Sequence, residues 1–224
     1  MTAKSRNRRA IRPVRKAIDA VAVIIDGETE EWYIKQVKVK YNPSVTRTLK
    51  ITPEFPEKKS VKELFNLAKG LIETETYTRV FLIVDLDEVL KSHSEWQAFQ
   101  NLYNKSQNPS KSYQWMKKLE VIVNTPCLEY WYLLHFKKTT RFYEDYARLK
   151  PELRKIPELA GYEKTEEYYN NTPQIYNRLF PYLTIARSNA FKFDVDNAAQ
   201  QGCSEMYKIF DYIDERAEQR FPLV

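Results

Sequence analysis

The sequence predicts an α/β protein with a mainly parallel sheet of about four strands, flanked by helices on both faces, in a chain of 224 residues. Three observations indicate this fold class. Short apolar runs without polar alternation are typical of strands that are buried on both faces. Segments with apolar residues at helical spacing lie between these runs, and that alternation is typical of a parallel sheet. Hydrophobic residues make up 43% of the chain, which is enough to fill a buried core.

The first half of the chain alternates between strand and helix patterns. The apolar run within 19–26 predicts a buried strand, and a helical pattern starts at Glu28. After the turn signal Asn42-Pro43, alternating apolar residues predict a second strand within 41–52. Ser60 is expected to cap the helix that follows it. These elements form the start of a strand–helix repeat.

The second half begins with two more strands and then becomes helical. The clearest strand covers 79–85, a polar helix covers 95–105, and a further strand covers 119–123. Beyond Cys127 the helical patterns are 128–136, 141–149, 174–190 and 205–218. The predicted organisation is a basic arm (1–18), an α/β core (19–136) and a helical C-terminal part packed on the core (137–224).

Composition excludes several classes of protein. With two Cys and two His, the chain cannot build a disulfide framework or a CxxC-type zinc site. Four Gly in the whole chain argue against a phosphate-binding P-loop. No apolar run is long enough for a membrane span, and no signal-peptide pattern follows the basic start. We therefore expect a soluble, cytoplasmic protein without a membrane partner.

Most of the net charge of +6 lies in the first 16 residues, which carry seven basic residues and no acid. The basic residues are Lys4, Arg6, Arg8, Arg9, Arg12, Arg15 and Lys16. Such an arm can neutralise the phosphates of a nucleic acid, RNA or DNA. It can equally be a solubilising tail, and both readings stay open here.

Acidic residues follow two of the predicted strands. Asp26 ends the first, and Asp85 and Asp87 end the strand 79–85. If these strands are neighbours, their carboxylates crowd together, which is costly unless they are protonated or hold a cation. Oxygen ligands of this kind suit Mg²⁺ or Mn²⁺. The alternative is that each Asp caps a helix or stabilises a turn, but two strand ends and an Asp-x-Asp favour the metal.

Four blocks of the sequence resemble the RloB-like protein family. Residues 23–33, with Asp26-Gly27-Glu28-Thr29-Glu30 at their centre, are similar to the family's opening Glu-Gly-Glu-Thr-Glu motif. Residues 80–88 match its acidic strand end, and 203–207 fit its last common helix. Residues 124–136 resemble its most specific block, which contains Pro126-Cys127-Leu128-Glu129.

The resemblance implies a Toprim-like fold and a nuclease effector of bacterial phage defence that acts by abortive infection. Toprim domains hold a divalent metal with a glutamate after the first strand and an Asp-x-Asp after the third. By this resemblance, Asp26, Asp85 and Asp87 are the metal ligands, and Asp26 stands at the general-base position. RloB-like proteins often accompany an ABC-type ATPase of the RloA kind, which is therefore the expected partner.

Asp26 departs from the family pattern, which has Glu at this position. Asp is shorter by one methylene, so its carboxylate reaches about 1.5 Å less far. General-base geometry is sensitive to such a change. Either the backbone compensates, or Glu28 or Glu30 takes part, or the activity is weakened. We count Glu30 as a candidate catalytic residue for this reason.

The block after the fourth strand contributes one more candidate. Glu129 falls near the start of a helix that Pro126 opens, and it is either a further acid of the cluster or a structural residue. His135 lies six residues later, off the same helical face, and is expected to be packed. Cys127 has no basic neighbour in sequence and is interpreted as buried packing, not as a nucleophile.

The sequence thus favours a divalent-metal-dependent endonuclease with Asp26, Glu30 and Glu129 as catalytic residues and RNA (including transfer RNA) or DNA as substrate. A different class stays open, namely a catalytically weakened Toprim-like subunit that binds or regulates an ABC-type ATPase. A third reading is an RNA-binding protein that works through the basic arm alone.

Overall fold

The computed structural model describes residues 20–52 and 58–220. The predicted arm (1–18) therefore lies outside the described residues, as do its seven basic side chains. Among the residues that are described, no helix combines the length and the apolar content that a membrane span requires.

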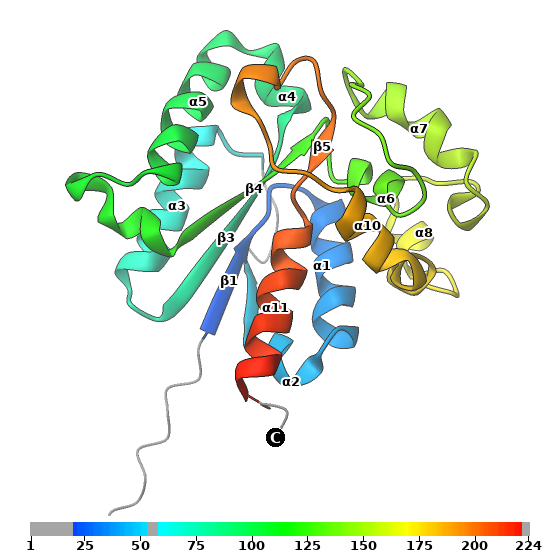
Figure 1. Cartoon of the computed structure of the whole chain (residues 1–224), viewed down its shortest axis with the longest axis horizontal. Helices are drawn as coiled ribbons and strands as arrows, with labels where there is room; N and C mark the ends of the chain where they lie inside the picture. Colours follow the sequence, from blue (N-terminus) through cyan, green and yellow to red (C-terminus); the bar gives the residue numbers. More distant parts are fainter. Residues whose placement is uncertain (1–19, 53–57, 221–224) are drawn as a thin grey trace, which may run out of the picture.

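The centre of the molecule is a five-stranded sheet in the order β2-β1-β3-β4-β5 (Figure 1). Four strands are mutually parallel: β1 (Ala20–Ile24), β2 (Leu49–Thr52), β3 (Tyr77–Asp85) and β4 (Leu119–Thr125). This confirms the predicted α/β class and the four predicted strands. The fifth strand, β5 (Cys203–Ser204), pairs antiparallel with β4 and was not predicted. It has only two residues, too few to show an alternating pattern.

Helices cover both faces of the sheet (Figure 1). One face carries α1 (Glu28–Lys40) and α11 (Tyr207–Arg220), and the other carries α3 (Val61–Glu73) and α5 (His93–Gln107). Because successive side chains of a strand point to opposite faces, Val21 and Val23 pack with α1 while Ala22 and Ile24 pack with α3. Both faces of β1 are therefore buried from solvent, as its continuous apolar run predicted.

Local sequence explains where α3 begins. Ser60 is its N-cap, and its side chain accepts a hydrogen bond from the backbone N–H of Glu63. The Glu63 carboxylate accepts a hydrogen bond from the Ser60 N–H in return, which completes a capping box. The Ser60 hydroxyl and backbone N–H also lower the pKa of Glu63. The predicted cap is confirmed, and it fixes the start of α3 beside the site described below.

The remaining helices are short. They are α2 (Pro43–Thr46), α4 (Leu86–Lys91), α6 (Glu129–Leu134), α7 (Tyr146–Arg154), α8 (Glu166–Asn170), α9 (Ile175–Leu179) and α10 (Leu183–Asn189). The 3₁₀ helices are η1 (Lys111–Lys118), η2 (Pro157–Leu159), η3 (Phe180–Tyr182) and η4 (Val195–Asn197).

Three helix predictions in the C-terminal part need correction. The helix expected over 141–149 begins at Tyr146, where Asp145 caps it with a side-chain hydrogen bond to the N–H of Arg148. The single helix expected over 174–190 is interrupted by η3, since Pro181 lacks the N–H that continues a helix. The last helix begins at Tyr207, because Cys203 and Ser204 form β5 and Glu205 and Met206 connect that strand to the helix.

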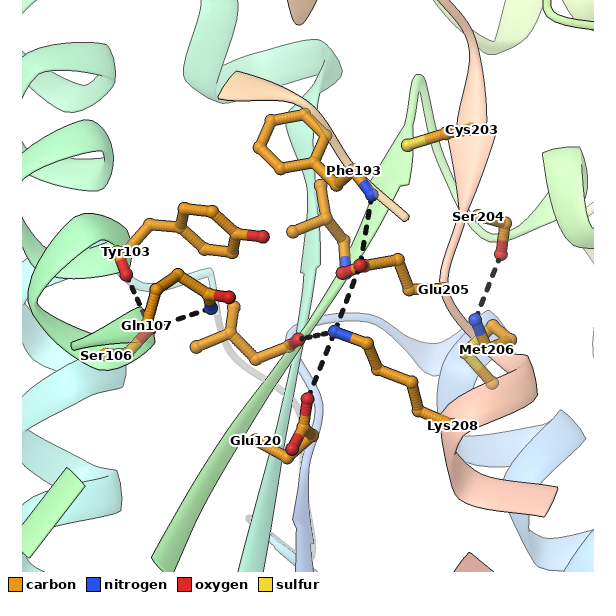
Figure 2. Close-up of polar contacts among 12 residues, drawn as sticks. Tyr103, Ser106, Gln107, Glu120, Phe193, Cys203, Ser204, Glu205, Met206 and Lys208 are labelled. Carbon is orange, nitrogen blue, oxygen red and sulfur yellow. Dashed lines mark hydrogen bonds and ion pairs between the residues drawn. The ribbon is translucent and has the colours of Figure 1, made fainter. Parts of the chain in front are cut away.

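A buried glutamate joins the end of the chain to the sheet (Figure 2). Glu205 is fully buried, and its carboxylate accepts hydrogen bonds from the backbone N–H of Val123 (3.3 Å) and of Phe193 (3.1 Å). Lys208 of α11 lies 3.0 Å from Glu205 and 3.1 Å from Glu120 of β4. The polar groups of this buried site are thereby paired, and β5 and α11 are held against β4. The part of the chain predicted to be helical thus adds the strand β5 to the sheet and packs α11 against it.

Candidate active site

The order of the strands places a crevice at one edge of the sheet. The chain passes from β1 to β2 on one side of β1, and β3 lies on the other side. In parallel sheets, ligands bind outside the carboxyl ends of the strands, where the strand order reverses in this way. A cavity of about 570 Å³ opens at this place, and Asp26, Glu30, Asp85 and Asp87 are among its lining residues. The sheet therefore brings together four of the acids that the sequence singled out.

Two of these acids are in direct contact. The carboxyl groups of Glu30, in the first turn of α1, and of Asp85, at the end of β3, are joined by a hydrogen bond. Gly27 is the N-cap of α1, and a Cβ atom there would collide with the Glu30 carboxylate. Glycine at this position therefore lets the Glu30 side chain fold back over the start of its own helix towards Asp85.

Asp85 is held from the side of β4. Its carboxylate accepts hydrogen bonds from the Asn124 side-chain amide (3.0 Å) and from the Leu128 backbone N–H (3.1 Å). Asn124 lies opposite Asp85 in the register of the two strands. The Ser204 hydroxyl of β5 in turn donates a hydrogen bond to the side-chain amide oxygen Oδ1 of Asn124 (2.6 Å). A chain of hydrogen bonds from β5 through β4 thus fixes the orientation of Asp85.

Burial and mutual repulsion raise the pKa of both carboxyl groups. Burial raises the pKa of Glu30, and the charge of Glu129 adds to the effect. Burial also raises the pKa of Asp85 well above its usual value, and the charge of Glu30 raises it further. A cluster of this kind is relieved by a proton or by a cation.

Asp26 and Asp87 stand nearer to solvent at the same cavity. Burial raises the pKa of Asp26, against a hydrogen bond of 3.1 Å that its carboxylate accepts from the Lys59 backbone N–H. Burial likewise raises the pKa of Asp87, whose carboxylate accepts a hydrogen bond of 2.8 Å from the Glu88 N–H. Asp87 makes a local turn contact, as the alternative reading of the sequence allows, and it also lines the cavity.

The cavity also contains a cation, Lys164, that the sequence analysis did not identify. It lies in the segment before α8, and its ammonium is 3.0 Å from the Glu129 carboxylate. Burial alone would lower the pKa of Lys164, but the charges of Glu129, Asp85 and Glu30 outweigh this and raise it. Lys164 is therefore charged and partly neutralises the acids around it. No motif or spacing in the sequence marks this lysine.

Glu129 lies behind Lys164, away from the cavity wall. Its side chain is fully buried, and the Tyr162 hydroxyl donates a hydrogen bond of 2.7 Å to it. The hydroxyls of Tyr162 and Tyr169 are 2.7 Å apart, and those of Tyr169 and Tyr132 are 3.0 Å apart. These buried tyrosines hold Glu129 in place, and Glu129 holds Lys164. The position suits a residue that orients the lysine.

The donor set at the cavity fits a hard divalent cation. Asp26, Glu30, Asp85 and Asp87 offer carboxylate oxygens, which Mg²⁺ and Mn²⁺ prefer. A cation would also reduce the repulsion that raises the pKa of Glu30 and Asp85. Within the part of the chain that the structure describes, no three His, Cys, Asp or Glu side chains are already arranged to hold a metal ion. Metal binding at these residues remains a prediction.

Two other residues have the structural surroundings that the sequence suggested. His135 is buried, and its Nδ1 donates a hydrogen bond of 2.8 Å to the Trp131 carbonyl oxygen. Burial lowers the pKa of His135 to about 4, so the ring is neutral near pH 7. Cys127 is buried, and burial together with the charge of Glu129 raises the pKa of its thiol well above the usual value. Neither side chain lines the cavity.

Comparison with protein families agrees with the four sequence blocks. The family model for RloB-like proteins matches residues 21–213. The chain belongs to the RloB-like family. The match runs from Val21 in β1 through β5 to the first half of α11, and it therefore includes every residue of the candidate site named above. Searches of curated proteins and of solved structures found no match for this RloB-like chain.

The raised pKa values predict how stability depends on pH at this site. A carboxyl group whose pKa is raised on folding costs stability as the pH rises from its unfolded value to its folded value. Glu30→Gln removes one charge and lets the new amide donate to Asp85. We expect this variant, without metal, to melt at a higher temperature than wild type at pH 8 and to lose that advantage by pH 4. Thermal melts across this range measure it.

Glu28→Gln is the matched control, because Glu28 is exposed in the same first turn of α1. It should show no pH-dependent gain. An equal loss of stability for Glu30→Gln at every pH would show that Glu30 is not held in a repulsive cluster.

Proposed function

We propose that this RloB-like protein is a divalent-metal-dependent phosphodiesterase that cleaves RNA or DNA as an effector of bacterial phage defence. One observation carries the proposal: the carboxyl groups of Asp26, Glu30, Asp85 and Asp87 and the charged Lys164 are among the groups that line one cavity. This cavity lies at the carboxyl edge of the sheet, where the strand order reverses. The family membership supports it, because the acids occur in the blocks that resemble RloB-like proteins. Cytoplasmic location and a Toprim-like fold belong to the same proposal.

The residues at the cavity suit the chemistry of phosphodiester cleavage. A bound Mg²⁺ or Mn²⁺ would supply an activated water and would stabilise the leaving oxygen. Asp26, Glu30, Asp85 and Asp87 are the residues placed to hold it. Lys164 directs a positive charge into the same cavity, where it can stabilise the charge that develops on a phosphate. Glu129 keeps that lysine in position.

The cavity also has a basic rim that suits a polyanionic substrate. Lys58, Lys59 and Lys91 line it beside the acids. Lys58 and Lys91 both pair with the exposed carboxylate of Glu88, at 3.2 and 2.6 Å. Exposed pairs of this kind contribute little and exchange readily, so both lysines can turn to a phosphate. The basic arm of residues 1–16 would add to this attraction, and an ABC-type ATPase partner would restrain the activity until infection.

Two observations favour the alternative that this chain is a binding or regulatory subunit. Lys164 already supplies a cation among the acids, and Asp26 is shorter than the glutamate of the family motif. A protein that has replaced its metal by a lysine would keep the fold and lose catalysis. The two functions differ in one respect, since only the nuclease needs a divalent metal to act.

A cleavage panel tests the proposal. Total transfer RNA, single-stranded RNA, plasmid and linear DNA are incubated with the protein in Mg²⁺ or Mn²⁺, and in parallel with a chelator. We expect cleavage of at least one substrate class that depends on the metal. If purified protein is inactive, expression in cells decides: toxicity lost in Asp85→Ala/Asp87→Ala supports a nuclease that awaits its partner, and unchanged toxicity contradicts a catalytic role.

A further inference from the structure

A second cavity, of about 500 Å³, lies on the surface between α3, α5 and η1. We call it the α3–α5 groove. Its wall includes Lys62 and Lys69 from α3, Asn101 from α5, and Tyr113 and Trp115 from η1. Figure 1 shows α3 and α5 together on the face of the sheet opposite α1 and α11. The described residues that line this groove are all different from those that line the acidic cavity.

The charge of the groove is positive. Among the described residues that line it, two are lysines and none is acidic. The 3₁₀ helix η1 adds Lys111, Lys117 and Lys118, all exposed, and contains no acid. Lys69 pairs with Glu73 at 3.6 Å, but both side chains are about half exposed, at 47% and 59%. A ligand that complements this surface carries negative charge.

The groove also offers flat aromatic surface and amide groups. Tyr113 and Trp115 are half-buried, so part of each side chain is accessible at the wall. Lys105 fixes Tyr113, with its ammonium 3.0 Å from the hydroxyl and 4.6 Å from the ring centre. The exposed amides of Asn66 and Asn101 stand on the two helices opposite. Aromatic rings among basic residues are the means by which proteins bind unpaired bases.

The groove and the acidic cavity use the same two helices. Val61 and Leu64 of α3 and Ser92 and Glu95 at the start of α5 line the acidic cavity. On α5 the groove residues lie one to two turns further along the helix, and on α3 they begin at Lys62, beside Val61, and extend to Lys69. One helical turn rises about 5.4 Å, so a chain that leaves the acidic cavity along α5 can reach the groove within a few turns.

We propose that the α3–α5 groove binds a single-stranded segment of nucleic acid, with Trp115 and Tyr113 stacking on an unpaired base and Lys62 and Lys69 contacting phosphates. A duplex keeps its bases paired and stacked, so it cannot present a free base to these rings. The proposal deepens the nuclease function and rests on it for the nature of the ligand. On this proposal, the α3–α5 groove is the surface that makes the protein prefer a substrate whose strand is unpaired near the scissile bond.

Binding without cleavage tests the groove. Fluorescence anisotropy is measured in a chelator, with short unstructured oligomers of deoxythymidine and of uridine and with a duplex of equal length. Trp115→Leu keeps an apolar side chain at that position and removes the ring. We expect it to weaken binding of both single strands about tenfold, which is the effect of losing one stacked base. Duplex binding by wild type should be weaker and should not change in this variant.

The lysines are tested by Lys62→Gln/Lys69→Gln. We expect the slope of log affinity against log salt concentration to fall by about 1.4, since each lost phosphate contact on a single strand accounts for about 0.7. Lys138→Gln/Lys155→Gln is the matched control, because both lysines are exposed and neither lines the groove. The basic arm is present in every variant, so the differences report the groove alone.

The outcomes separate this proposal from the nuclease function. The groove proposal is overturned if the groove variants bind single strands with the affinity of the wild type. It is also overturned if a duplex binds as tightly as a single strand and depends on the same residues. If the protein cleaves nothing under any condition and the groove variants still lose binding, the groove stands and the nuclease proposal fails. If the protein cleaves while the groove variants bind normally, the nuclease stands and the groove fails.

Discussion

Replacing Asp85 and Asp87 together by alanine is expected to slow metal-dependent cleavage about 10³-fold or more. Both side chains line the acidic cavity, and Asp85 is fixed by Asn124 and by the Leu128 N–H. Losing metal-assisted stabilisation of several kcal/mol corresponds to about this factor in rate. Alanine is preferred to asparagine at 85, because an asparagine NH₂ group would face one of two hydrogen-bond donors. Single-turnover rates on the substrate found in the cleavage panel measure the effect.

Glu88→Ala is the matched control for this variant. Glu88 lines the same cavity and is the next residue in the chain, but its carboxylate is about half exposed, at 53%, and pairs with surface lysines. Its rate should stay within a few-fold of wild type. A double Asp variant that is folded, as shown by circular dichroism, and cleaves at the wild-type rate would remove the acidic cavity from the mechanism.

Replacing Lys164 by methionine is expected to destabilise the metal-free protein by about 3 kcal/mol. Methionine keeps much of the side-chain length and removes the charge. The Glu129 carboxylate is fully buried and would lose the ammonium that lies 3.0 Å away. Breaking a buried ion pair from one side typically costs about 3–5 kcal/mol, and we take the lower end because 31% of the Lys164 side chain is exposed. Urea denaturation in a chelator measures this free energy.

Divalent metal should reverse part of that loss. If a cation can bind among the same carboxylates, Mg²⁺ or Mn²⁺ raises the melting temperature of Lys164→Met by more than that of wild type. Lys150→Met is the control, because Lys150 pairs with the partly exposed Glu163 and should cost less than about 1 kcal/mol. A Lys164→Met variant as stable as wild type would contradict the assignment of Lys164 as the cation of this cluster.

The sequence predicted the acids of the site better than it predicted their arrangement. Continuous apolar runs located β1, β3 and β4, and the acids at the ends of β1 and β3 followed directly. Whether Asp26 and Asp85 meet depends on β1 and β3 being neighbours, which is a property of strand order. The side-chain contact between Glu30 and Asp85 depends on Gly27 as well, and no periodicity in the sequence shows it.

Residues that act through tertiary contacts could not be identified from the sequence. Lys164 comes from a loop 35 residues after Glu129, and ordinary lysines occur throughout the chain. The strand β5 was not predicted, because two residues are too few to show a hydrophobic pattern. Its Ser204 nevertheless orients Asn124. The helices predicted over 141–149 and 174–190 were too long. Capping by Asp145 starts the first one later, and the missing N–H of Pro181 interrupts the second, although the apolar spacing continues. Both are local signals that the sequence contains, and they limit helices that apolar spacing alone would continue.

The most direct test of the account is the uptake of Mn²⁺ by the purified protein, followed through the electron paramagnetic resonance signal of the free ion. The measurement needs no substrate and no partner, so it addresses the acidic cavity alone. We predict saturable binding near pH 8 that weakens as the pH falls, because Glu30 and Asp85 must release their protons. Binding should be lost in Asp85→Ala/Asp87→Ala and kept in Glu88→Ala. No uptake by wild type, or uptake that the double variant retains, would contradict a metal centre at this site.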